Sequence, residues 1–213
     1  MEDIDLACDI FSEGFNSRVL CESAQRLFEL SINAFDAFVL AWLSELPIES
    51  EMLKFGRRVL GAAERQEAER AAYDRGSDDT RLIHETAWKV QHEIHRMKGL
   101  LRFSPDDNGT YIARFASDHF ALPALADYFT SRFGKETPWA IIDEKRCLFM
   151  YSQGGAKAKV AFGGIRDAKT GKKDSWEELW KHYHKTINNE SRYNPDLQRQ
   201  FIPERYWKYL PEM

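Results

Sequence analysis

The spacing of apolar residues changes at Gly99, and this change constrains the fold more than any other feature of the sequence. From about Ser17 to Lys98 apolar residues recur every three or four positions, which is the period of amphipathic helices. After Gly99 they alternate with polar residues, as in half-buried strands. We therefore predict an α+β protein in which an N-terminal helical bundle precedes a sheet.

The helical segment divides into several helices. Pro47 marks a break, because proline is tolerated only near a helix start, and the next helix runs from about Glu49 to near Gly76. Asp78 and Asp79 are the expected N-caps of the last helix. One continuous apolar stripe on that helix consists of Ile83, Ala87, Val90, Ile94 and Met97.

The segment after Gly99 predicts two hairpins separated by a helix. The expected strands are 100–103, 111–115, 139–143 and 147–151. A turn at 105–109 joins the first two, a helix at 122–133 follows them, and a final helix begins at Ser175 with a capping-box pattern. The predicted architecture is a four-stranded antiparallel sheet in ββαββα order with helices on one face.

The predicted domains are a helical region (1–98), a sheet with helices (99–190) and an aromatic and basic C-terminal tail (191–213) packed on the sheet domain.

Charge is uneven along the chain. Residues 1–150 carry 18 Lys and Arg against 26 Asp and Glu, whereas residues 151–213 carry 12 against 8. A polyanion would be attracted to the C-terminal part, although a solvated surface explains this modest imbalance about as well.

Composition argues against a membrane protein and against a cysteine-built metal site. The longest apolar stretch, around Ala34–Leu46, is too short and too polar to span a bilayer. The N-terminus is acidic and lacks the pattern of a secretory signal, so we expect a cytoplasmic protein with no membrane partner. The three cysteines form no CxxC pair and are expected to be reduced and mostly buried. No metal or cofactor is predicted.

Four residues are candidates for acid–base chemistry: Glu93, His95, Asp118 and His119. His92 and His95 do not form the HExxH arrangement, in which two histidines share a helix face, and His92 is expected to point to solvent. Asp118 precedes a helix, where aspartate commonly caps exposed amides. A carboxylate that orients an imidazole is also how general bases are made. Capping and surface histidines are the structural alternative to catalysis.

Two further segments have simpler interpretations. Asp143 and Arg146, at the second hairpin, indicate turn chemistry and an ion pair. The stretch Gly154–Lys173 contains five glycines and six basic residues but neither GxxxxGK[ST] nor GxGxxG. We interpret it as a basic loop, not a phosphate loop, whose charge can still steer a phosphate backbone in a salt-dependent way.

The C-terminal tail interleaves aromatic and basic side chains. Aromatic faces can stack on unpaired bases while guanidinium groups hold phosphates. The opposing interpretation is a structural strap, in which the aromatic side chains anchor the tail and the arginines bond backbone carbonyls. The predicted nucleic-acid contacts are Arg192, Arg199, Arg205, Trp207 and Lys208 in the tail, with Arg102 and Arg114 on the exposed face of the sheet.

The tail also resembles a family signature. Residues 194–210, NPDLQRQFIPERYWKYL, closely resemble the C-terminus of a bacterial family of unknown function whose members are labelled putative DNA repair or DNA metabolism proteins. Other segments similar to that family are Lys89–Glu93, His95–Phe103, Asp118-His119, Arg132-Phe133, Trp139 with Asp143 and Arg146, and Leu179-Trp180. The resemblance implies a neighbouring radical-SAM protein and, in some members, fusion to a uracil-DNA-glycosylase-like domain. Because this chain has no CxxxCxxC motif, cluster chemistry would belong to the partner.

These observations favour a nucleic-acid-binding accessory protein of DNA metabolism that works with a radical-SAM partner. One alternative is an enzyme acting on a nucleobase or phosphodiester, which requires the four acid–base candidates to converge in a pocket. Another is a protein–protein adaptor without affinity for DNA, whose tail is structural. The decisive observation is whether Trp207 and the arginines of the tail are exposed together or buried against the sheet.

Overall fold

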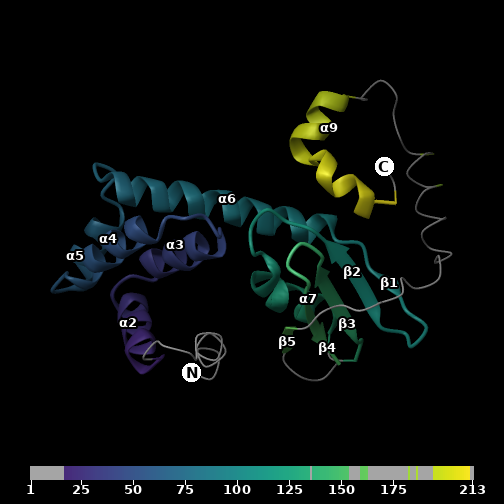
Figure 1. Cartoon of the computed structure of the whole chain (residues 1–213), viewed down its shortest axis with the longest axis horizontal. Helices are drawn as coiled ribbons and strands as arrows, with labels where there is room; N and C mark the ends of the chain where they lie inside the picture. Colours follow the sequence, from purple (N-terminus) through teal and green to yellow (C-terminus); the bar gives the residue numbers. More distant parts are fainter. Residues whose placement is uncertain are drawn as a thin grey trace. The chain divides into compact units, whose positions relative to one another are not determined.

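A computed structural model describes residues 17–134, 136–153, 159–162, 182, 186 and 194–211. Its contacts divide the chain into two units, Met1–His92 and Glu93–Met213, and the boundary falls within the long helix α6 (Asp78–Leu100). The first unit is helical and the second contains the strands (Figure 1). The predicted α+β character and the helical N-terminal part are confirmed.

The first unit packs several helices around an apolar core. Its helices are α2 (Ser17–Leu30), α3 (Ile32–Leu43), α4 (Glu49–Leu60), α5 (Arg65–Ala72) and the first part of α6. Ser31 caps α3, because its side chain accepts a hydrogen bond from the Ala34 amide at 3.0 Å. Arg58 of α4 holds α6 through two bonds to the Asp79 carboxylate, at 2.6 and 2.7 Å.

Helix α6 differs from the prediction at both ends. It begins at Asp78, so Asp78 and Asp79 lie in its first turn and are not its N-caps. It continues through Gly99 to Leu100, while all five residues of the predicted apolar stripe are buried. Because the helix takes up Leu100, the prediction of a strand at 100–103 is wrong. A two-residue strand, β1 (Ser104–Pro105), follows instead, and Arg102 lies outside it.

The second unit contains one mixed sheet. Within the described residues its five strands lie in the order β1-β2-β3-β4-β5. The remaining strands are β2 (Tyr111–Phe115), β3 (Trp139–Asp143), β4 (Leu148–Ser152) and β5 (Lys159–Phe162). Strand β1 is antiparallel to β2, β3 to β4, and β4 to β5, but β2 and β3 are parallel. The prediction of an antiparallel sheet is therefore wrong, and β5 is a strand that the predicted ββαββα order lacks.

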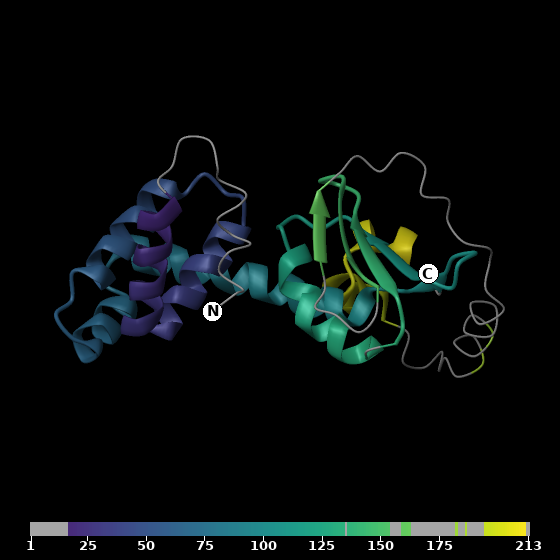
Figure 2. The ribbon, with the colours of Figure 1, turned by 90° about the horizontal axis from the view of Figure 1, so that it is seen from below.

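A helical crossover explains the parallel pair. The 3-10 helix η1 (Leu122–Leu125) and α7 (Ala126–Phe133) connect β2 to β3, and parallel neighbours need such a long connection. Phe129 and Phe133 of α7 contact Trp139, with ring centroids 6.4 and 6.2 Å apart, so α7 packs on the sheet (Figure 2). Helix α7 ends at Gly134, whose φ of +69° is one that residues with a side chain rarely adopt.

The described part of the tail forms α9 (Pro195–Phe201) and the 3-10 helix η3 (Glu204–Tyr209). Asn194 caps α9 by accepting a hydrogen bond from the Leu197 amide at 3.0 Å. No residue of α9 is buried, whereas Tyr206 and Leu210 are. The tail is thus anchored through η3, and α9 is left exposed.

Three predicted features lie outside the described residues. They are Arg192, the helix from Ser175 (apart from His182 and Thr186) and the basic loop 154–173 (apart from β5). Among the helices that the structure describes, none is both long and apolar enough to cross a membrane.

Candidate functional site

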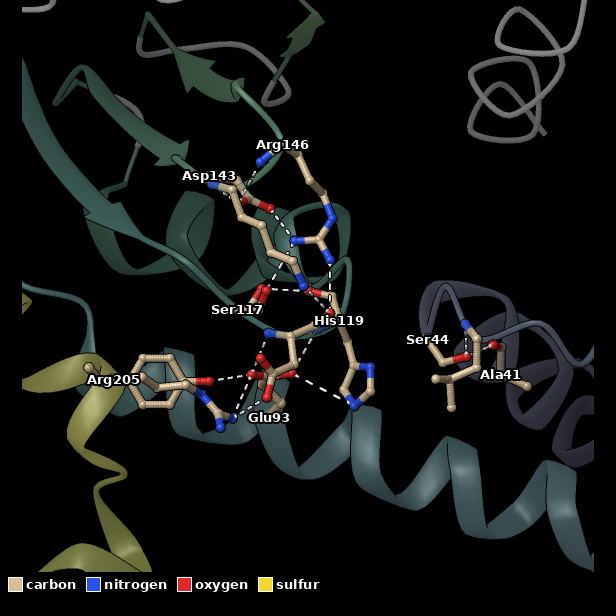
Figure 3. Close-up of polar contacts among 12 residues, drawn as sticks. Ala41, Ser44, Glu93, Ser117, His119, Asp143, Arg146 and Arg205 are labelled. Carbon is tan, nitrogen blue, oxygen red and sulfur yellow. Dashed lines mark hydrogen bonds and ion pairs between the residues drawn. The ribbon is translucent and has the colours of Figure 1, made fainter.

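The carboxylate of Glu93 is the centre of a polar network in the second unit (Figure 3). Glu93 projects from α6, and its side chain is 3% exposed. It accepts hydrogen bonds from the backbone amides of Asp118 and His119, both at 3.0 Å, and from the Tyr206 hydroxyl. The Arg205 guanidinium donates to the same carboxylate at 3.3 Å. Donors from two distant segments of the chain therefore converge on one buried acid.

The turn that precedes η1 is also held by the turn between β3 and β4. Arg146 donates to the carbonyl oxygens of Ser117 and Asp118, at 3.3 and 3.1 Å. The ammonium group of Lys145 donates to the Asp118 carbonyl at 2.9 Å. Arg146 pairs with the buried carboxylate of Asp143 at 2.8 Å, so the predicted ion pair is confirmed. Because its backbone groups are bonded from both sides, this turn has a fixed position.

Arg205 connects the tail to this turn. Its guanidinium lies 2.8 Å from the Asp118 carboxylate and 3.3 Å from that of Glu93. It also lies over the ring of Tyr206, 4.7 Å from the centroid, which is a cation–π distance. One arginine thus bridges two acids while its own position is set by the neighbouring aromatic ring.

A second anchor of the tail is Glu144, in the turn between β3 and β4. Its carboxylate accepts a hydrogen bond from the Tyr209 hydroxyl at 2.7 Å and lies 3.5 Å from the Lys208 ammonium. Arg114 of β2 lies 3.7 Å from the same carboxylate. Residues of η3 therefore contact α6, the turn before η1 and the β3–β4 turn.

Ionisation of Glu93 is favoured by its donors. Burial by itself raises the pKa of this carboxyl, but the hydrogen bonds from Tyr206 and from the amides of Asp118 and His119 outweigh burial and hold the pKa of Glu93 below its usual value. Burial, and then the bond to Glu93, raise the pKa of Tyr206. Glu93 is therefore an ionised acceptor whose oxygens are engaged by fixed donors, an arrangement suited to holding segments together.

Three of the four acid–base candidates meet in this network. His119 Nε2 lies 3.9 Å from the Glu93 carboxylate, and Asp118 lies on the same turn. His95 is exposed on α6 and is not brought into the network by any described contact. The expected capping role of Asp118 is wrong, because η1 begins at Leu122 and no side chain caps it.

The predicted phosphate contacts are paired within the molecule wherever the structure describes them. Arg199 lies 2.9 Å from Glu204, and Arg102 donates to the Gly99 carbonyl at 2.8 Å. The paired cations are Arg102, Arg114, Arg199, Arg205 and Lys208. A phosphate that binds any of them has to replace or share an existing partner.

The aromatic side chains of the tail divide into anchored and exposed ones. Trp207 is half-buried, and its indole N–H donates to the Ile202 carbonyl at 2.8 Å. Phe201 and Leu197, by contrast, are 64% and 48% exposed. They lie four residues apart on α9, so they are neighbours on one face of the helix. Phe201 is one of the tail aromatics that the sequence predicts can stack on bases, although the list of predicted contacts does not name it. Leu197 is not part of that prediction, although its spacing from Phe201 is visible in PDLQRQF.

Comparison with known proteins identifies a family for this chain. No curated protein and no solved structure matches the chain. Residues 52–212 match the domain of unknown function DUF4130, and this region includes Glu93, the turn before η1 and the tail through η3. Because the match covers more than half of the chain, the protein belongs to the DUF4130 family.

Proposed function

We propose that this protein is a nucleic-acid-binding accessory protein of DNA metabolism or repair that works with a radical-SAM partner. The DNA and radical-SAM parts of the proposal rest on the resemblance of the tail and of the α6 segment to proteins carrying that label. The binding part rests on α9, which has no buried residue and is followed directly by the anchored η3.

The observation that carries the binding surface is the exposure of Phe201. Phe201 is 64% exposed, on a helix with no buried residue, and Arg199 is on the same helix with its side chain 53% exposed. A ring so exposed contributes little to the core and is available for stacking on an unpaired base. Arg199 can then exchange its exposed partners, Asp196 and Glu204, for a phosphate.

The enzyme alternative receives less support from the network around Glu93. A general base needs a free lone pair and room for a substrate, whereas the Glu93 oxygens are occupied by four donors. Glu93 is therefore poorly suited to act as a general base.

Fluorescence anisotropy with labelled single-stranded and duplex DNA tests the proposal. We expect preference for the single strand, because only unpaired bases offer a free face, and a loss of about tenfold or more for Phe201→Ala. Leu53→Ala, which removes an exposed side chain of α4, is the matched control and should bind like wild type. Equal affinity of wild type and Phe201→Ala, or no binding by wild type, would overturn the role of α9.

An adaptor without DNA affinity is the second candidate, because Leu197 and Phe201 together form an apolar patch that can dock on a protein. Co-purification with the neighbouring radical-SAM protein separates the two candidates. If Leu197→Ala and Phe201→Ala abolish co-purification while wild type shows no salt-sensitive DNA binding, the adaptor is correct.

A further inference from the structure

A stacked pair of aromatic rings lies on the surface of α6, within the first unit. The indole of Trp88 and the imidazole of His92 have centroids 4.9 Å apart and ring planes inclined by 14°. The two residues are four positions apart, so they share one face of the helix. His92 is exposed, and Trp88 is 61% exposed, more than any other large apolar residue described in the first unit. The pair therefore contributes little to the core.

The geometry of this pair suits the binding of a further planar ring. One face of the indole lies against His92, and the 61% exposure of Trp88 leaves much of its side chain in solvent. The indole N–H has no hydrogen-bond partner among the described residues. Unpaired nucleobases bind proteins by stacking on aromatic side chains, and a base on Trp88 would add a third plane to the existing stack.

A cation without a partner lies next to the pair. Lys89 is exposed and has no hydrogen bond or ion pair within the described part of the chain, unlike the described cations of the tail. Because the phosphate of a nucleotide lies to the side of its base, a lysine beside the stacking ring can meet it without giving up another contact. Glu85, one turn earlier, is also exposed and reduces the net attraction. Stacking therefore has to supply most of the binding.

We propose that Trp88, backed by His92, is a stacking site for an unpaired nucleobase. The proposal rests on the proposed function in taking a single-stranded nucleic acid as the ligand, but the contact is on the helical unit and shares no residue with α9. His92 is a positioning residue, because its ring supports the indole and sets its orientation. All four bases should be accepted, since each has a face that can stack.

Photo-crosslinking of the full chain to single-stranded oligonucleotides that carry 5-iodouracil at several positions tests the site. On irradiation this base bonds to an aromatic ring stacked on it. Trypsin releases Trp88 in peptide 82–89 and Phe201 in peptide 200–205, so the two contacts are read separately. We expect a crosslink in 82–89. Its absence overturns the Trp88 site whatever is found in 200–205, and its presence without a crosslink in 200–205 counts against α9 alone.

Variants of the pair separate stacking on a base from a role in helix stability. Fluorescence anisotropy with the same oligonucleotides should show a loss of about fivefold or more for Trp88→Ala. His92→Phe keeps a ring behind the indole and should bind like wild type, whereas His92→Ala should bind less well. Circular dichroism checks that each variant keeps its helices. Full binding by Trp88→Ala, or equal binding by His92→Phe and His92→Ala, overturns the proposed arrangement.

The chain offers a matched control in a second stacked pair of the same unit. Tyr73 stacks on His84 with centroids 5.4 Å apart and planes inclined by 16°, and Tyr73 is 51% exposed. The residue that follows it is the exposed acid Asp74, where Trp88 is followed by Lys89. Tyr73→Ala should therefore bind like wild type. A loss equal to that of Trp88→Ala would contradict a specific site at Trp88.

Discussion

The Tyr206 hydroxyl donates a hydrogen bond to the carboxylate of Glu93, a residue 113 positions earlier in the chain. Both groups are buried, and the bond joins η3 to α6 at the point where the turn before η1 also meets the carboxylate. Both partners lie within residues 52–212, the region that matches the DUF4130 family. Part of the tail signature is therefore structural, because Tyr206 holds the tail in place.

Removal of this bond should cost stability. Tyr206→Phe leaves the ring in place and removes one charge-assisted hydrogen bond, so we expect a loss of about 2 kcal/mol in the free energy of unfolding. Glu93→Gln removes the negative charge and places a side-chain NH₂ donor opposite the turn amides, which are themselves donors. We expect this change to cost about 3 kcal/mol in the free energy of unfolding. Urea unfolding of both single variants and the double variant gives a coupling energy of about 1 kcal/mol or more. Additive losses would contradict the contact.

The stability contributed by Glu93 depends on pH in a defined direction. Its donors hold the folded-state pKa below the ordinary value of 4.5. A lowered pKa stabilises the fold above the unfolded-state pKa, and this contribution is lost as the pH falls through the folded-state pKa. The stability difference between wild type and Glu93→Gln should therefore be constant from pH 7 to pH 5 and shrink below pH ~4.5. Chemical unfolding at several pH values measures this stability difference. A difference that does not change with pH would rule out a lowered pKa of Glu93 in the folded state.

Two ion pairs with the same i,i+3 spacing differ in burial and should therefore differ in their contribution to stability. Asp143 and Arg146 are 0% and 10% exposed, whereas Arg199 and Asp196 are 53% and 92% exposed. Asp143→Ala leaves a buried guanidinium without its partner and should cost about 3 kcal/mol. Asp196→Ala removes a solvated pair and should cost less than about 0.5 kcal/mol. Thermal unfolding of the two variants under one set of conditions checks this order.

The strands could be predicted better than their arrangement. Alternation predicts Tyr111–Phe115 and Trp139–Asp143 correctly, because it reports which face of a strand is buried. Alternation carries no information on whether neighbouring strands run parallel or antiparallel. The helix predicted at 122–133 did contain that information, because a strand, a helix and a strand in succession favour a parallel pair. At 100–103 the apolar spacing fits a helix end as well as a strand, and the helix continued to Leu100.

The network around Glu93 is encoded partly in sequence and partly only in the fold. Glu93 lies between Val90 and Met97 on the buried face of α6, and an acid within an apolar stripe indicates a buried charge that needs donors. The identity of those donors is not a local property. Asp118, His119 and Tyr206 are 25, 26 and 113 residues away, and only the crossover and the tail bring them together.

Two glycines should respond oppositely to alanine. Gly134 ends α7 with a φ of +69°, so Gly134→Ala imposes backbone strain and should destabilise the protein by about 1 to 2 kcal/mol. Gly99 lies within α6, and an added Cβ there meets nothing within 4 Å. Gly99→Ala should stabilise the protein by about 0.5 to 1 kcal/mol. Shifts of the same sign in a thermal melt would contradict this.

The salt dependence of DNA binding should be shallow if the tail carries the contact. Its described cations are Arg199, Arg205 and Lys208, and each has an acidic partner, so few counterions are released when a phosphate takes that place. For two phosphates neutralised on a single strand, the slope of log K against log salt is about −1.4. Arg199→Ala should reduce its magnitude by about 0.7. Phe201→Ala should weaken binding at every salt concentration without changing the slope, because stacking releases no counterion.

Anisotropy titrations between low and physiological salt measure these slopes. A wild-type slope steeper than about −3 would place most of the contact on cations outside this part of the tail.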